Sequence, residues 1–300
     1  MLHILNGDSL RAIFPEELEE NTITWREILS EGPVKTRVDS EFWSLRANFL
    51  GAHTDYAEKV TGEWEAILQS EGDVTFWFEH DLVCQVNLIF LLAQLHLRAG
   101  LRERKVYLVC INHYPGIERF KGLAQLNPHD LIELYDNRAQ LTVDDYEKAL
   151  HTWNLYSGEN AIAFSALVFD QPHNFKFLRE AIVAHLEKFP SAQNGLSRLE
   201  QKMISYIDTG ISDATKLERL MIETDNVYGL TDHGFKILLN TINPLLREET
   251  DLQLNELGNA ILRDEKDFTG FRTGRLRLGG ADGSAFRWDR VSKQLVSNVN

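Results

Sequence analysis

The chain has 300 residues, 43% of them hydrophobic and 25% charged, which is an ordinary globular composition and excludes extended disorder. Its formal charge of −14 at pH 7 excludes general coating of nucleic acid or of an anionic membrane, because the average field repels phosphate, so DNA binding would need a local basic surface. We expect two domains, since one domain usually holds roughly 100–200 residues.

Short apolar runs alternate with helical patterns in the first part of the chain. The runs cover residues 2–5, 22–25, 74–78 and 105–111, and an amphipathic helix is expected over 82–97. Continuous apolar runs separated by helical stretches are typical of strands in a parallel sheet that is covered on both faces. The sequence therefore predicts an α/β domain over residues 1–140.

The pattern becomes helical over residues 141–194, which we interpret as a helical connector. Thr142 followed by Asp145 indicates a helix start, and apolar residues recur at helical spacing over 177–189 until Pro190 ends the pattern. The following stretch AQNGLS, residues 192–197, is the clearest linker in the chain.

Residues 195–300 predict a mainly helical, winged-helix-like domain that ends in a β-hairpin. Ser197 with Glu200 forms a capping-box pattern at the start of one helix, which Gly210 ends, and two more helices follow before Pro244. Over 275–297 apolar and polar residues alternate around the sequence ADG, as in a β-hairpin or a small meander.

Several features favour a cytoplasmic protein without a membrane partner. The first ten residues lack the basic region and the long apolar region of a signal peptide. The longest apolar stretch, Leu82 to Leu97, contains polar residues and is shorter than the roughly 20 residues that a bilayer requires. Cys84 and Cys110 each lie in an apolar run, which is typical of reduced core thiols and not of a disulfide framework.

A set of motifs resembles one known family. In chain order they are HILNGDS at the N-terminus, WREILSEGPV at 25–34, WFEHDLVCQVNLIFLL, GLSRLEQ at 195–201, and LRLGG with RWD at 287–289. Their order resembles the uncharacterised bacterial family called domain of unknown function 1835. The resemblance implies a bacterial origin and a fold grouping, but no catalytic residue, because the family name carries no activity.

Polar residues follow each predicted strand. They are Asn6, Gly7, Asp8 and Ser9 after the first strand, Arg26 and Glu27 after the second, Glu79, His80 and Asp81 after the third, and Asn112 and His113 after the fourth. Ligands of open α/β sheets bind beyond the carboxyl ends of the strands, and in a parallel sheet these groups share one rim. Such a rim is suited to general acid–base chemistry, to a divalent cation or to a phosphate.

Each of these residues also has a purely structural explanation. Asp8, Ser9 and Asp81 are residue types that cap helix N-termini, and Arg26 and Glu27 can pair with neighbouring side chains. The NGDS stretch lacks the further glycines and the lysine of known nucleotide-binding loops. Ser9 also does not lie in a complete G-x-S-x-G nucleophile elbow of a hydrolase.

A zinc site is a weaker alternative. His80 and Cys84 lie four residues apart, and Cys110 and His113 three apart, so the four could in principle surround one ion. The apolar surroundings of both cysteines instead favour small hydrophobic core residues. We therefore name no metal ligand and no cofactor.

The C-terminal tail offers a competing site. Residues 268–300 contain six basic residues and two aspartates, which is a local excess of positive charge in an acidic protein. A DNA-binding wing would have this charge. The helix TDHGFKILLNTIN, however, offers one lysine and one aspartate for reading bases, so solvated charges or docking onto the acidic first domain remain alternatives.

Our hypothesis is a pocket for a small phosphate-bearing or nucleotide-like molecule at the rim of the parallel sheet. His80, Asp81 and Glu79 are the candidate catalytic residues, with His80 as the titrating group. The candidate ligand-binding residues are Asn6, Gly7, Asp8, Ser9 and Asn112. The alternatives are a DNA-binding or regulatory protein that uses the C-terminal module, and a non-catalytic interaction scaffold, so the sequence leaves open whether the protein is an enzyme.

Overall fold

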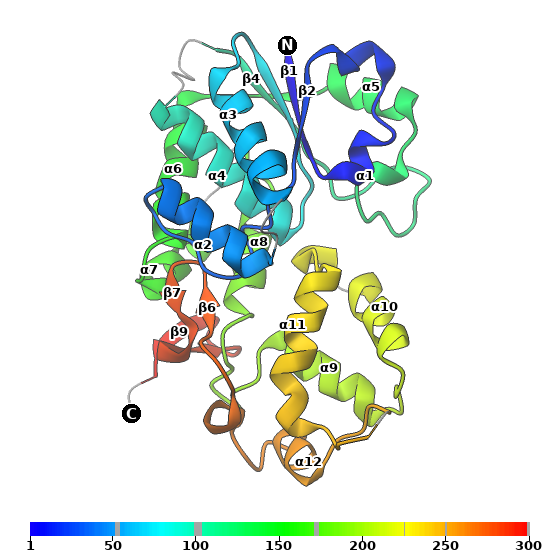
Figure 1. The fold of residues 1–300 in the computed structure, drawn as a ribbon, viewed down its shortest axis with the longest axis vertical. Helices are drawn as coiled ribbons and strands as arrows, with labels where there is room; N and C mark the ends of the chain where they lie inside the picture. The colour runs from blue at the N-terminus through cyan, green and yellow to red at the C-terminus, as the bar shows by residue number, and fades with distance from the viewer. Residues whose placement is uncertain (52–54, 99–103, 171–173, 225, 250, 299–300) are drawn as a thin grey trace.

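The computed structural model describes residues 1–51, 55–98, 104–170, 174–224, 226–249 and 251–298. One end of the molecule is a sheet with helices on both faces, and the other end is a group of helices, with short C-terminal strands at the side (Figure 1). The predicted α/β class, with a mainly helical later part, is confirmed. No helix in these residues has the length and apolar character needed to cross a membrane.

The sheet contains five strands in the order β2-β1-β3-β4-β5. The strands are β1 Leu2–Asn6, β2 Thr22–Trp25, β3 Val74–Trp77, β4 Val106–Val109 and β5 Ala139–Leu141. The first four are parallel, as predicted, and their carboxyl ends form one rim. The short β5 was not predicted; it pairs antiparallel with β4 and carries too few apolar residues to form a recognisable run.

Alternate side chains of the strands enter two hydrophobic clusters, one on each face of the sheet. Ile4 and Phe76 belong to the larger cluster, and Leu5, Trp77 and Val109 belong to the smaller one. The larger cluster is covered by α2 Ser40–Leu50, α3 Gly62–Gln69, α4 Leu82–Arg98 and α6 Val143–Tyr156 (Figure 1). The smaller one is covered by α1 Asp8–Arg11 and α5 Pro128–Asp136. Burial on both faces explains why the strands are continuous apolar runs.

The predicted helix starts are confirmed where a cap was recognised. Thr142 with Asp145 caps α6, and Ser197 with Glu200 caps α9. The remaining helices are α7 Ala161–Ser165, α8 Leu178–Leu186, α9 Arg198–Asp208, α10 Ala214–Thr224, α11 Asp232–Ile242 and α12 Glu256–Leu262. Shorter helical segments are η1 Glu16–Asn21, η2 Ala57–Thr61, η4 Leu123–Gln125, η5 Ala166–Phe169, η6 Asn226–Tyr228, η7 Asn243–Leu245, η8 Phe268–Phe271 and η9 Gly283–Ala285.

The expected linker at 192–197 joins α8 to α9 but is not an exposed tether. Asn194 is 3% exposed, and its amide donates to Gln201 Oε1 and Asp264 Oδ1, each at 2.8 Å. The larger hydrophobic cluster continues through this region by way of Phe189 and Leu196. Polar residues that resemble a loop in sequence are here buried by their tertiary contacts.

The C-terminal strands form two separate hairpins, which confirms the predicted β-hairpin at the end of the chain, although the residues ADG, at the centre of the alternating pattern, form neither turn. In one, β6 Arg277–Leu278 pairs with β7 Ala281–Asp282; in the other, β8 Phe286–Asp289 pairs with β9 Gln294–Ser297. The first turn falls at Gly279 and Gly280, where φ of Gly279 is +61° and a Cβ on Gly280 would lie 1.9 Å from Ser157 O. This turn contacts the segment that follows β2, because Val34 N donates to Gly279 O at 3.2 Å. The position of this turn at Gly279 and Gly280 is therefore the one that allows the backbone to approach Val34 and Ser157 closely.

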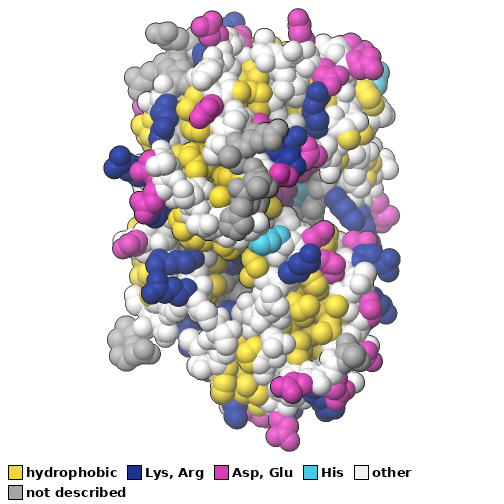
Figure 2. All heavy atoms as spheres, in the orientation of Figure 1, with side chains coloured by type: hydrophobic (Ala, Val, Ile, Leu, Met, Phe, Trp, Pro, Cys, Tyr) yellow, Lys and Arg dark blue, Asp and Glu magenta, His cyan; other side chains and the backbone are white. Residues whose placement is uncertain are grey.

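The loop after β2 is held by a fully buried ion pair. Arg46 donates to Glu27 Oε1 at 2.6 Å, and both side chains are 0% exposed. The Tyr56 hydroxyl donates to the other carboxylate oxygen of Glu27. Figure 2 shows many other charged side chains at the surface of the visible face, where water screens them.

We expect the replacement Arg46→Met to destabilise the protein by about 3–5 kcal/mol, because it leaves the Glu27 carboxylate buried without its counterion. Adding Glu27→Gln should recover part of this loss. Urea unfolding followed by circular dichroism measures both effects. The matched control is Lys35→Met, which removes the exposed ion pair with Glu41 and should cost about 1 kcal/mol or less; equal effects of the two single replacements would contradict the prediction.

Candidate functional site

Three side chains converge at the rim of the sheet, where β3 leads into α4. One ligand atom each from Glu79, Asp81 and Cys84 lies within 4.8 Å of the other two, and we call these residues the rim cluster. Glu79 follows the end of β3, and Asp81 precedes α4. The Asp81 carboxylate caps α4 by accepting a hydrogen bond from Cys84 N at 3.0 Å, which confirms its predicted capping role and turns Cys84 toward the carboxylates.

Glu79 is enclosed by the segment that follows β4. Its Oε1 accepts a hydrogen bond from Leu123 N at 2.5 Å, and a Cβ on Gly122 would lie 2.3 Å from the same oxygen. Burial, reinforced by the negative charge of Asp81, raises the pKa of Glu79 to about 7. This carboxyl group therefore exchanges its proton near neutral pH.

Asp81 and Cys84 are also buried, at 6% and 1% exposure. Burial raises the pKa of Asp81, and burial together with the two carboxylates raises the pKa of the Cys84 thiol well above its usual range. In the described part of the chain no lysine or arginine forms an ion pair with Glu79 or Asp81. The cluster therefore holds a half-buried acid, Glu79, and a buried acid, Asp81, and neither forms an ion pair with a described lysine or arginine.

A chain of amides supports the cluster from the β1 side. Asn6 Nδ2 lies 3.0 Å from Cys84 Sγ, and Asn6 Oδ1 accepts a hydrogen bond from Asn87 Nδ2 at 3.0 Å. The same Asn87 nitrogen donates to Glu27 O at 2.7 Å. The predicted convergence of Asn6 with Glu79 and Asp81 is therefore present, and it is made through Cys84.

His80 contacts the part of the chain that holds α9 to α12, residues 198–262, which we call the helical module. Asn226 Nδ2 lies 3.1 Å from His80 Nε2 and 3.0 Å from Phe120 O, and Phe177 lies edge-on to the imidazole ring. Gly229 from the same segment lies against Asp81, where an added Cβ would be 2.5 Å from Oδ1. The helical module thus covers the rim next to the cluster.

Asp8 and Ser9 do not cap α1 as the structural explanation had supposed. Gly7 occupies the N-cap position with φ at +92°, and no side chain caps this helix. Asp8 instead pairs with Arg26 at 2.7 Å, and this hydrogen bond lowers the pKa of Asp8. Arg26 also pairs with Glu63, so the predicted pairing of Arg26 is confirmed. Ser9 is exposed at the same end of the sheet.

The fourth strand contributes less than expected. Asn112 is exposed and contacts the ring of His113 at 2.9 Å, and the described contacts do not join it to the rim cluster. Cys110 is a free thiol like Cys84, and its nearest polar partner is Gln85 Nε2 at 3.5 Å. Among the described residues, the side chains close enough together to bind one cation are therefore Glu79, Asp81 and Cys84. Cys110, His80 and His113, which the sequence had suggested as possible zinc ligands, are not among them.

Sequence reasoning missed the groups that close the site from a distance. Leu123 N, Gly122 and Asn226 come from segments without a recognisable motif, and Asn87 lies within an apolar helix. Only Asn87 left a usable signal, because a polar residue in the middle of a buried helix needs a hydrogen-bond partner.

Comparison of the chain with protein-family models and with curated proteins finds no match in either. The resemblance to domain of unknown function 1835 stays a prediction, and the functional argument rests on the geometry of the chain.

The raised pKa of Glu79 predicts a specific dependence of stability on pH. Between its ordinary value of 4.5 and its folded value of about 7, the folded protein holds a proton that the unfolded chain releases. The free energy of unfolding should therefore fall as pH rises through this window, by at most about 3 kcal/mol from this group.

Glu79→Gln should remove this contribution while keeping an oxygen for Leu123 N. Urea unfolding in the presence of EDTA between pH 5 and 8 measures the change, with the exposed Glu65→Gln as control. Parallel pH profiles for the wild type and Glu79→Gln would contradict the assignment.

Proposed function

We propose that the rim cluster binds a divalent cation and, through it, a small phosphate-bearing ligand. The observation that supports the proposal is the close approach of Glu79, Asp81 and Cys84, within 4.8 Å of one another and without a lysine or arginine partner in the described residues. Carboxylates with little access to water are stabilised by a proton or by a cation, and the close approach of these three side chains allows them to bind one cation.

The ligand set favours a borderline metal such as Zn²⁺. A thiolate with two carboxylates matches the sulfur and oxygen ligands that zinc accepts, and three protein ligands leave a fourth position for an exogenous oxygen. Cation binding would reverse the local electrostatics, because it favours the ionised forms of the same groups whose pKa values burial raises.

A cation also reconciles an acidic rim with a phosphate-bearing ligand. Two carboxylates alone repel a phosphate, whereas a bound divalent ion attracts one. The backbone at Gly7, on the neighbouring strand end, has open space where a side chain would lie, and Ser9 is exposed beside it. Because Gly7 N already donates to Trp25 O at 3.0 Å, the hydroxyl of Ser9 is the group of this pair that offers a hydrogen bond to a ligand, as the sequence hypothesis expects.

Isothermal titration with Zn²⁺ tests the cation step. Wild-type protein should bind one equivalent, and Cys84→Ala should weaken binding at least about tenfold, because it removes the sulfur ligand. Cys110→Ala is the matched control, since it removes the other free thiol, which lies outside the cluster. Equal affinities for the two variants, with urea midpoints close to wild type, would reject the site.

The phosphate step has its own measurement. In a thermal-shift assay, inorganic phosphate and ATP should raise the melting temperature in the presence of Zn²⁺ more than in the presence of EDTA, because a ligand of the native state stabilises it. The difference between the two conditions should disappear in Asp81→Asn. An equal shift with and without the metal would argue against a cation-bridged ligand.

A further inference from the structure

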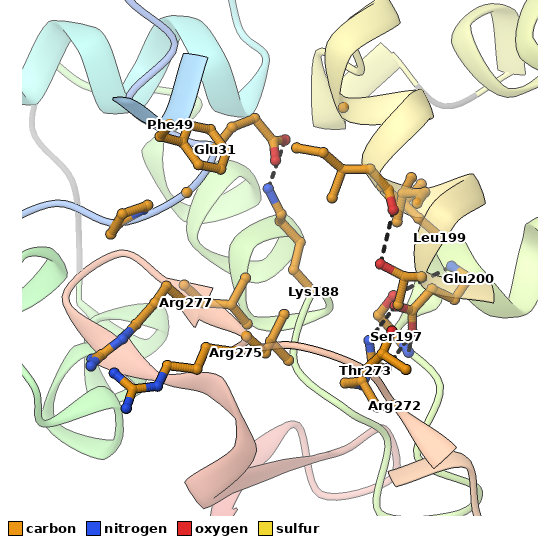
Figure 3. A pocket seen from close by; sticks show the side chains of 18 of the residues that line it. Glu31, Phe49, Lys188, Ser197, Leu199, Glu200, Arg272, Thr273, Arg275 and Arg277 are labelled. Carbon is orange, nitrogen blue, oxygen red and sulfur yellow. Dashed lines mark hydrogen bonds and ion pairs between the residues drawn. The ribbon is translucent and has the colours of Figure 1, made fainter. Parts of the chain in front are cut away.

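A cavity that shares no lining residue with the rim cluster lies between the segment after β2, with α2, and the helices α9 and α11. It has a volume of about 310 Å³, at the lower end of the range for small-molecule sites. Residues 31–33 and Phe49 line it on one side, α11 and the start of α9 on another, and residues 272–278 close it from below in the view of Figure 3. Most of its lining is apolar, including Leu199, Leu230, Ile237, Leu238, Leu276 and Leu278.

The charged side chains of this cavity are of two kinds. Lys188 pairs with Glu31 at 2.8 Å, and Arg272 pairs with Glu200 at 2.6 Å, so these four charges are internally compensated. Arg275 and Arg277 line the same cavity.

Neither of these two arginines has an ion-pair or hydrogen-bond partner among the described residues. Arg275 is exposed and Arg277 is partly buried. Figure 3 shows both guanidinium groups extending to the same side of the cavity, away from Lys188. These two arginines give the cavity a positively charged edge, without an ion pair among the described residues, in a protein of net charge −14.

We propose that this cavity binds a small amphipathic anion. Its apolar chain would contact the leucine and isoleucine side chains, and its carboxylate or phosphate group would contact Arg275 and Arg277. An apolar cavity stabilises the chain by removing it from water, and guanidinium groups recognise both acid groups through paired hydrogen bonds.

The shape and the apolar lining of the cavity favour this ligand over a nucleic-acid backbone, which is the other anion that the basic C-terminal tail suggests. A phosphodiester chain binds along an exposed charged surface, whereas here the arginines border a mainly apolar hollow. Two further arginines of the tail are not free for DNA, because Arg272 pairs with Glu200 and Arg287 with Asp267. The proposal is independent of the rim cluster, with which the cavity shares no lining residue.

Isothermal titration of the full-length protein with decanoate and decyl phosphate tests the proposal, with both amphiphiles kept below the concentrations at which they form micelles. At least one should bind about tenfold or more tightly than decanol, which lacks the charge, and acetate, which lacks the chain. The decanoate and decyl phosphate arms distinguish a carboxylate from a phosphate headgroup.

Two kinds of variant test the assigned residues. The double replacement Arg275→Gln/Arg277→Gln should weaken binding at least about tenfold, while Arg219→Gln, an exposed arginine of α10 outside the cavity, should leave binding unchanged. Leu238→Trp should block the chain by filling the cavity. Circular dichroism and urea midpoints show whether each variant is folded. If Leu238→Trp does not fold, the double arginine variant alone tests the proposal.

The proposal is overturned if neither amphiphile binds better than decanol and acetate, or if the double arginine variant binds them as the wild type does. Retention of the wild type on a DNA column that depends on Arg275 and Arg277, without amphiphile binding, would assign the arginines to nucleic acid instead. Because Cys84→Ala should not alter amphiphile binding, failure of the rim proposal is separately detectable.

Discussion

The buried ion pair between Arg46 and Glu27 is the interaction on which the rest of the structure depends. Neither charge is tolerated alone in an interior of low polarity, so α2 and the end of β2 must meet at one place. The guanidinium also donates to the carbonyl oxygens of Ile28, Glu31 and Pro33 at 2.8, 2.5 and 3.1 Å. One side chain thereby satisfies the polar backbone of a loop that would otherwise be costly to bury.

This loop, residues 27–34, supports both proposed sites. On one side it holds Asn87, which positions Asn6 against Cys84 at the rim. On the other side its Glu31 end lines the cavity and pairs with Lys188. A change in the loop would therefore reach both sites.

The segment from Asn226 to Leu230 is the second structural element shared by the two sites. It contacts His80 through Asn226 and Asp81 through Gly229, and Leu230 lines the cavity. Gly229 has φ at +57°, and a side chain there would collide with Asp81 and Val83. The close approach of the helical module to the rim thus depends on the absence of a side chain at this position.

The sequence by itself determined the local elements. The parallel strands and the caps at Thr142 and Ser197 follow from apolar runs and from side chains that bond to nearby backbone, which are properties of neighbouring residues. It also placed Glu79 and Asp81 at the correct end of the sheet. Only the tertiary structure decided that Cys84 joins them and that Gly279 makes the C-terminal turn, because burial, raised pKa values and docking arise from segments far apart in the chain.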